Sequence, residues 1–127
     1  MTERRLLQIA VALGSLVPII AGAAGILSGP AMIDAGGPVS ADSHFRYLSG
    51  LLLGIGIAFV TTIPGIERHT GRFRVLAGIV VAGGVGRLAS LLLRGAPDAA
   101  MLAALTMELV VTPALALWQA RVAGQFS

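Results

Sequence analysis

Four long apolar runs constrain this sequence more than any other feature. Each run is about 20 residues long, the length that an α-helix needs to cross the hydrocarbon core of a bilayer. Hydrophobic residues make up 56% of the chain and charged residues only 12%, which leaves too little polar surface to cover a water-soluble globule. We therefore expect an all-α integral membrane four-helix bundle, a single transmembrane domain over residues 1–127 with spans near 6–27, 44–63, 73–93 and 99–118.

Turn and capping signals separate these runs. Pro64-Gly65 follows the second run, and Gly95-Ala96-Pro97 follows the third. Because glycine and proline break helices, both segments predict a helix end. Asp42 or Ser43 is the predicted N-cap of the second helix and Asp98 that of the fourth, since their side-chain oxygens can accept bonds from the first free backbone amides.

Arginines near the ends of the runs favour one orientation in the membrane. An even number of spans places both termini on the same face. Positively charged short loops stay in the cytoplasm, so the face with more arginines is expected to be cytoplasmic. This topology also explains the net charge of +3, and we therefore predict no nucleic-acid partner. Six arginines fall on the face of the termini and two on the other: Arg4, Arg5, Arg68, Arg72, Arg74 and Arg121 against Arg46 and Arg94.

Glu108 is the only acidic residue inside the predicted spans. Nine residues at about 1.5 Å each place it roughly 14 Å below the outer end of the fourth helix, close to the bilayer centre. An isolated carboxylate is costly there, so it must be protonated, paired or in contact with water. Arg87, roughly 9 Å below the outer end of the third helix, lies within reach. The sequence therefore predicts an intramembrane ion pair between Arg87 and Glu108.

Helical spacing places other polar side chains in the same outer half. Ser90 shares a helix face with Arg87, and Arg46 with Ser49 begins the second helix at a similar height. Two arginines suit an anion, because guanidinium groups form charge-assisted hydrogen bonds with phosphates and carboxylates. We expect a polar cavity open to the outer face, with the ligand-binding residues Arg46, Arg87, Glu108, Ser49, Ser90 and His44.

A purely structural interpretation stays open beside this one. Arg87 and Glu108 could simply lock the third helix to the fourth, while Arg46 extends toward lipid phosphates. The glycines of Gly50-Leu51-Leu52-Leu53-Gly54 and of Gly83-Gly84-Val85-Gly86 are interpreted as helix-packing positions.

The sequence gives no sign of a metal site or of catalytic residues. His44 and His69 have no second ligand at metal-binding spacing, and the chain has no cysteine. Neither a Ser-His-Asp set nor a pair of carboxylates emerges from the pattern. We therefore predict no metal, no cofactor and no catalytic residue.

Three segments carry a resemblance to a known family. They are Phe45-Arg46-Tyr47-Leu48-Ser49-Gly50, Gly84-Val85-Gly86-Arg87-Leu88-Ala89-Ser90, and Glu108-Leu109 with Pro113. With these motifs the chain resembles a bacterial membrane family designated domain of unknown function 4345, whose members are small four-helix proteins with a similar charge pattern. The resemblance implies the fold and the choice of residues. It implies no reaction, ligand or partner.

Three classes of function are compatible with these features. The leading hypothesis is a non-enzymatic membrane protein that binds a lipid headgroup, a small amphiphile or a membrane partner subunit through the Arg/Glu cluster. The first alternative is a small proton-coupled transporter that uses Glu108, and the second is an intramembrane lipid-modifying enzyme. We expect the protein to cross the bacterial inner membrane several times and to have membrane lipids, a second copy or a larger membrane complex as partners.

Overall fold

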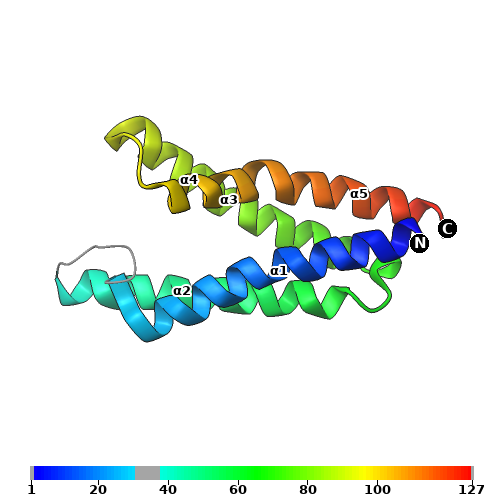
Figure 1. Ribbon diagram of the computed structural model, residues 1–127, viewed down its shortest axis with the longest axis horizontal. Helices are drawn as coiled ribbons and strands as arrows, with labels where there is room; N and C mark the ends of the chain where they lie inside the picture. Colours follow the sequence, from blue (N-terminus) through cyan, green and yellow to red (C-terminus); the bar gives the residue numbers. More distant parts are fainter. Residues whose placement is uncertain (1, 31–37, 127) are drawn as a thin grey trace. The chain divides into compact units, whose positions relative to one another are not determined.

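The part of the protein that the structure describes is almost entirely helical, with short turns between the helices. The computed structural model describes residues 2–30 and 38–126, and no strand occurs among them. A 3-10 turn, η2 (Ile66–Arg68), precedes α3, and a π-helical segment, η3 (Met107–Val111), joins α4 to α5. The predicted all-α fold is confirmed. Figure 1 shows the helices in chain order from blue to red: α1 (Glu3–Ser28), α2 (Val39–Thr62), α3 (Thr70–Arg94), α4 (Ala99–Thr106) and α5 (Thr112–Gly124).

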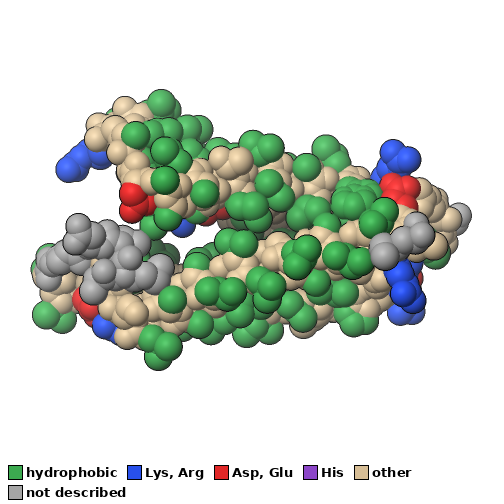
Figure 2. Space-filling model, viewed as in Figure 1, with side chains coloured by type: hydrophobic (Ala, Val, Ile, Leu, Met, Phe, Trp, Pro, Cys, Tyr) green, Lys and Arg blue, Asp and Glu red, His purple; other side chains and the backbone are tan. Residues whose placement is uncertain are grey.

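Four continuous helical stretches are long and apolar enough to cross a membrane, as predicted. They are Glu3–Ser28, Val39–Thr62, Thr70–Arg94 and Ala99–Gly124, the last of which combines α4, η3 and α5. Large apolar side chains project outward from these stretches, and Figure 2 shows hydrophobic side chains along the long faces of the helices. Such surfaces are stable in lipid and not in water.

The helices extend further than the apolar runs predict. The second stretch begins at Val39 and not near residue 44, and the fourth continues to Gly124 and not only to 118. The predicted bounds follow hydropathy alone. Backbone hydrogen bonds, by contrast, continue through polar residues at the ends of a span, where water can surround the side chains.

The prediction that Asp42 or Ser43 caps α2 is wrong. The first helical hydrogen bonds run from the amides of Ala41 and Asp42 to the carbonyl of Pro38, whose backbone is extended (φ −67°, ψ 156°). Asp42 therefore lies inside the first turns and pairs with Arg46 one turn later. The predicted cap at Asp98 is confirmed, because its side chain accepts a hydrogen bond of 2.9 Å from the amide of Met101.

Contacts along the chain divide it into two compact units. One unit contains Gln8–Pro64, and the other contains Met1–Leu7 together with Gly65–Ser127. We describe each unit by itself.

In the Gln8–Pro64 unit, α1 and α2 pack as antiparallel neighbours through small residues. A Cβ atom at Gly22 would lie only 2.6 Å from the backbone nitrogen of Leu53 and 2.7 Å from the carbonyl oxygen of Ser49. At Gly56 a Cβ would lie 2.7 Å from the Ile19 side chain. The backbones approach this closely only because these positions have no side chain.

The glycine pair that the sequence suggests for close packing is not the one that joins α1 to α2. Around a Cβ built at Gly54 no described atom lies within 4 Å, and at Gly50 only the tip of Ile26 comes within 3.9 Å. The contact uses the neighbouring face of α2, with Ser49 and Gly56. Hydropathy does not distinguish these two faces, because both consist of small and apolar residues.

In the second unit, α3 packs antiparallel to the α4–η3–α5 stretch. Phe73, Leu76 and Val122 are buried, together with Leu7 from the first turns of α1 and Ile66 from η2. Gln119 on α5 is fully buried, and its Nε2 donates to the carbonyl of Ile66 at 2.9 Å and to the Thr70 hydroxyl at 3.0 Å. These bonds connect α5 to the start of α3.

The two termini lie together in this unit. Glu3 accepts hydrogen bonds of 3.0 Å from the Trp118 indole and from the Gln125 amide, and it forms an ion pair of 3.1 Å with Arg121. All six arginines that favour a cytoplasmic face belong to this unit as well. The termini therefore share one end, and their cytoplasmic location stays a prediction.

Glu67 forms an ion pair with Arg4 at this end. The distance from Arg4 Nε to the Glu67 carboxylate is 2.7 Å. The hydrogen bond from Arg4 lowers the pKa of Glu67, and a backbone hydrogen bond adds to this effect. A lowered pKa means that the folded protein binds this proton more weakly than the unfolded chain does.

The Glu67 pair therefore predicts a loss of stability in acid. The pair contributes fully to folding stability above the pKa of Glu67 in the unfolded chain, about 4.3. This contribution disappears as the pH falls through the lower pKa of Glu67 in the folded protein. Glu67→Gln retains an acceptor for Arg4 but cannot titrate. We expect thermal melting in detergent, measured from pH 7 to pH 3.5, to fall more steeply for the wild type than for the variant. Parallel curves would show that Glu67 does not contribute.

Candidate functional site

Arg87 and Glu108 form the ion pair that their heights along the helices predict. Arg87 Nε donates to Glu108 Oε1 at 2.7 Å, and the pair joins α3 to η3. The Arg87 side chain is 36% exposed, whereas that of Glu108 is 15% exposed. In a low-dielectric environment such a short, charge-assisted contact is strong, provided that the rest of each group also finds partners.

Gly84 allows Glu108 to come this close to α3. A Cβ atom at Gly84 would lie 2.9 Å from the Cβ of Glu108 and 2.8 Å from the Leu109 side chain. Of the glycines in the Gly83-Gly84-Val85-Gly86 segment, Gly84 is thus the one that packs against another helix. Gly83 and Gly86 have no described atom within 4 Å of an added Cβ. The packing interpretation of this segment is confirmed at Gly84.

The π-helical turn around Glu108 follows from the residues after it. Pro113 has no amide hydrogen, so the carbonyl four residues earlier, at Leu109, loses its helical donor. The Thr112 hydroxyl donates to the carbonyl of Met107 at 2.8 Å, five residues back. Such π-turns inside α-helices occur frequently at functional sites, because they redirect the neighbouring side chains. Here the turn contains Glu108.

The second carboxylate oxygen of Glu108 is buried and unsatisfied. Glu108 Oε2 has no hydrogen-bond partner among the described residues. A buried acceptor without a donor is unusual, because leaving it unpaired costs about 1–3 kcal/mol and more for a charged group. A water molecule could donate the missing hydrogen bond to this oxygen.

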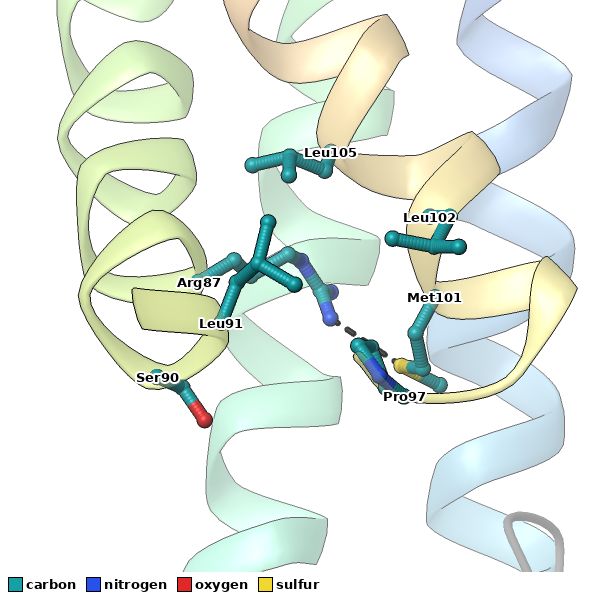
Figure 3. Close-up of a pocket in the computed structure, with 7 residues that line it drawn as sticks. All are labelled: Arg87, Ser90, Leu91, Pro97, Met101, Leu102 and Leu105. Carbon is teal, nitrogen blue, oxygen red and sulfur yellow. Dashed lines mark hydrogen bonds between the residues drawn. The ribbon is translucent and has the colours of Figure 1, made fainter. Parts of the chain in front are cut away.

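The other edge of the Arg87 guanidinium faces a cavity. Arg87 Nη1 has the Met101 thioether sulfur as its neighbour at 3.2 Å, which is a weak acceptor for a charged donor. Figure 3 shows the guanidinium between α3 and the start of α4, directed toward Met101 and Pro97. The cavity has a volume of about 120 Å³ and is lined by Arg87, Ser90, Leu91, Pro97, Met101, Leu102 and Leu105.

This cavity is small, largely apolar and open. Ser90, Pro97 and Leu102 are exposed residues at its rim. A dry cavity of about 150 Å³ can hold benzene, so a volume of this order accommodates one compact group and not a whole lipid. The site therefore presents one cation to a small group, with apolar side chains around it.

Ser90 is the third predicted site residue in this unit. It lines the same cavity as Arg87 and is exposed. The structure thus brings together Arg87, Glu108 and Ser90 of the six predicted ligand-binding residues. The remaining three, Arg46, Ser49 and His44, lie on α2 in the Gln8–Pro64 unit.

Arg46 has a local role at the end of α1. Its Nε forms an ion pair of 2.9 Å with Asp42, and its Nη1 donates to the carbonyls of Ile26 and Leu27. These carbonyls lie in the last turn of α1, where helical donors are missing and the helix dipole is negative. Arg46 Nη1 therefore caps the C-terminal end of α1. The sequence predicts instead that this guanidinium binds a ligand.

Ser49 and His44 also have contacts within their own unit. Ser49 is only 6% exposed and lies where α1 and α2 meet. A Cβ atom at Gly25 would collide with its hydroxyl group. His44 is exposed and stacks on Tyr47, with ring centres 6.4 Å apart. Ser49 thus takes part in helix packing, and His44 in an aromatic pair at the start of α2.

Two features of the site escape sequence reasoning. Met101 contacts Arg87, but an isolated methionine in an apolar run has no signal that distinguishes it from a lipid-facing residue. The π-turn has a signal in Thr112-Pro113, although the pattern alone does not give its position. Among the described residues, no three His, Asp or Glu side chains lie together as a metal site would require.

Comparison with known proteins identifies a family for this chain. No curated protein and no solved structure matches this sequence. Residues 6–119 match the family model described as Domain of unknown function (DUF4345), so the match covers most of each of the four apolar stretches, together with the Arg87–Glu108 pair and the cavity beside it. The chain therefore belongs to the DUF4345 family.

Proposed function

We propose that this protein is a non-enzymatic, multi-pass protein of the bacterial inner membrane that binds the anionic headgroup of a small amphiphile at Arg87. The observation that supports this most directly is that the two edges of the Arg87 guanidinium have different surroundings. Its Nε edge is held by Glu108, and its Nη1 faces an open cavity where a thioether is its hydrogen-bond partner.

The ion pair orients Arg87 for a ligand. A free arginine side chain has many rotamers, and ordering it on binding costs free energy. The 2.7 Å contact with Glu108 fixes the guanidinium in advance. A phosphate, sulfate or carboxylate in the cavity would replace the weak sulfur contact with charge-assisted hydrogen bonds.

The lining of the cavity favours an amphiphile over a free inorganic anion. Leu91, Leu102 and Leu105 surround the guanidinium with apolar surface. The volume of about 120 Å³ accommodates a headgroup and the first carbon atoms of a chain, and the rest of the chain would extend from the open rim into lipid. Such a ligand satisfies both the cation and the apolar walls.

Catalysis has less support. A hydrolytic or transfer reaction at Glu108 would need a nucleophile or a second proton carrier within hydrogen-bond reach. Among the described residues, the side chain that hydrogen-bonds to Glu108 is Arg87, which stays protonated in proteins. Binding, unlike catalysis, needs no nucleophile or second proton carrier beside Glu108.

Binding of octyl sulfate to the purified protein, measured by titration calorimetry in detergent, tests this proposal. Arg87→Gln removes the charge but leaves a donor for Glu108, and we expect affinity to fall at least tenfold, as the loss of a charge-assisted hydrogen bond implies. Arg94→Gln is the matched control, since it removes the same charge from an exposed position two turns further along α3. Equal loss in both variants would reduce the effect to general electrostatics and contradict a site at Arg87.

A further inference from the structure

The charge balance around Arg87 changes when an anion arrives. In the ligand-free site one guanidinium compensates one carboxylate, so the pair is neutral. A bound monoanion leaves two negative groups beside one positive group. In a partly buried site of low dielectric, such an uncompensated charge is costly and shifts protonation equilibria.

Glu108 is the group that can remove the excess charge. On α3, the charged residue that faces Glu108 is Arg87. α4 contributes no charged residue in Ala99–Thr106. On α5 the charged residue is Arg121, in its last turn at the other end of the unit. Arg94 and Asp98 lie at the exposed outer end of α3 and at the cap of α4. Among the described residues of this unit, Glu108 is thus the acid that contacts the Arg87 guanidinium beside the cavity.

The geometry of Glu108 is compatible with a proton. Its Oε1 accepts the bond from Arg87 Nε, whereas its buried Oε2 has no donor among the described residues. A proton on Oε2 would neutralise the carboxylate without displacing the Arg87 bond. The guanidinium could then compensate the ligand in place of Glu108, and its orientation would be unchanged.

We propose that the site binds an anion together with a proton, which Glu108 takes up on Oε2. This inference rests on the proposed anion site at Arg87 and adds a second bound species to it. Per ligand, one negative charge and one proton enter, so the net charge of the site stays zero. Affinity should therefore increase as the pH falls, by up to tenfold per pH unit in the range where Glu108 is ionised in the ligand-free protein and protonated in the complex.

Calorimetric titration with octyl sulfate at pH 7.5, in two buffers of different ionisation enthalpy, tests the coupling. The probe stays a monoanion in this range, so any proton that the buffer loses is taken up by the protein. We expect about one proton per bound octyl sulfate in the wild type and in Arg94→Gln. Glu108→Gln should bind with no proton uptake and with an affinity that is independent of pH.

The outcomes separate this inference from the proposed function. Saturable, Arg87-dependent binding without proton uptake by the wild type would overturn the coupling and leave the anion site in place. No Arg87-dependent binding by the wild type would overturn both. The number of protons taken up is measured on the wild type alone. The inference can therefore be overturned even if Glu108→Gln does not fold.

Discussion

Replacing Arg87 by methionine is expected to destabilise the protein by about 2–3 kcal/mol, less than the roughly 3–5 kcal/mol for a fully buried pair, because the Arg87 side chain is 36% exposed. The substitution leaves Glu108, which is 15% exposed and has one unsatisfied oxygen already, without its partner. The carboxylate of Glu108 then loses the hydrogen bond from Arg87 Nε. Unfolding of the purified protein in mixed micelles, followed by circular dichroism, measures the loss.

Two further variants show whether the pair is the cause. Arg94→Met removes an exposed arginine from the same helix and should change stability by no more than about 0.5 kcal/mol. Arg87→Met combined with Glu108→Met replaces both charges by apolar groups, and most of the lost stability should return. If the double variant lost as much stability as Arg87→Met and Glu108→Met lose together when each is measured alone, the pair would not be an interacting unit.

Gly22→Ala is expected to cost about 1–3 kcal/mol, because its methyl group would lie within 3 Å of three backbone atoms on α2. The nearest, at 2.6 Å, is the nitrogen of Leu53. Backbone atoms inside a helix cannot rotate away as side-chain ends can, so the two helices must separate. The same unfolding experiment measures the cost.

Gly54→Ala is the matched control for this prediction. It makes the same chemical change in a membrane-length helix, but no described atom lies within 4 Å of the added carbon. Because alanine favours the helical state over glycine by roughly 0.5–1 kcal/mol, this variant should be neutral or slightly more stable. If Gly22→Ala and Gly54→Ala destabilised the protein equally, the close contact between Gly22 and the backbone of α2 would be contradicted.

Hydropathy and spacing predicted the features that depend on the bilayer or on helix geometry. Each apolar run became a membrane-length helix, since backbone groups in lipid must be satisfied within the helix. Arg87 and Glu108 form an ion pair as their spacing predicts, because about 1.5 Å per residue fixes their heights on antiparallel neighbours. The position of Asp98 before an apolar run predicts its role as the N-cap of α4.

The features that the sequence did not predict depend on rotation about the helix axis and on local competition for hydrogen bonds. Ser49 and Gly56, and not Gly50 and Gly54, meet α1, because several small-residue faces of α2 are equivalent in composition. α2 begins earlier than the apolar run predicts, at Val39, because polar residues continue the helix beyond that run.

Arg46 shows the same limit for a functional residue. Its spacing made it a candidate ligand for an anion, but its height does not reveal that the free carbonyls at the end of α1 lie within reach. Gln119 is similar, because an amide in an apolar run can face lipid, water or a buried carbonyl. Its bonds to Ile66 and Thr70 depend on how α5 is rotated against α3.

Native mass spectrometry of the detergent-purified protein tests the anion site most directly, because it weighs whatever the protein retains from its own membrane. We expect the wild type and Arg94→Gln to carry a small anionic amphiphile, and Arg87→Gln to be folded and to lack it. A wild type that retains no such molecule, or an Arg87→Gln variant that retains the same one equally well, would contradict the account and leave Arg87 and Glu108 as a structural pair.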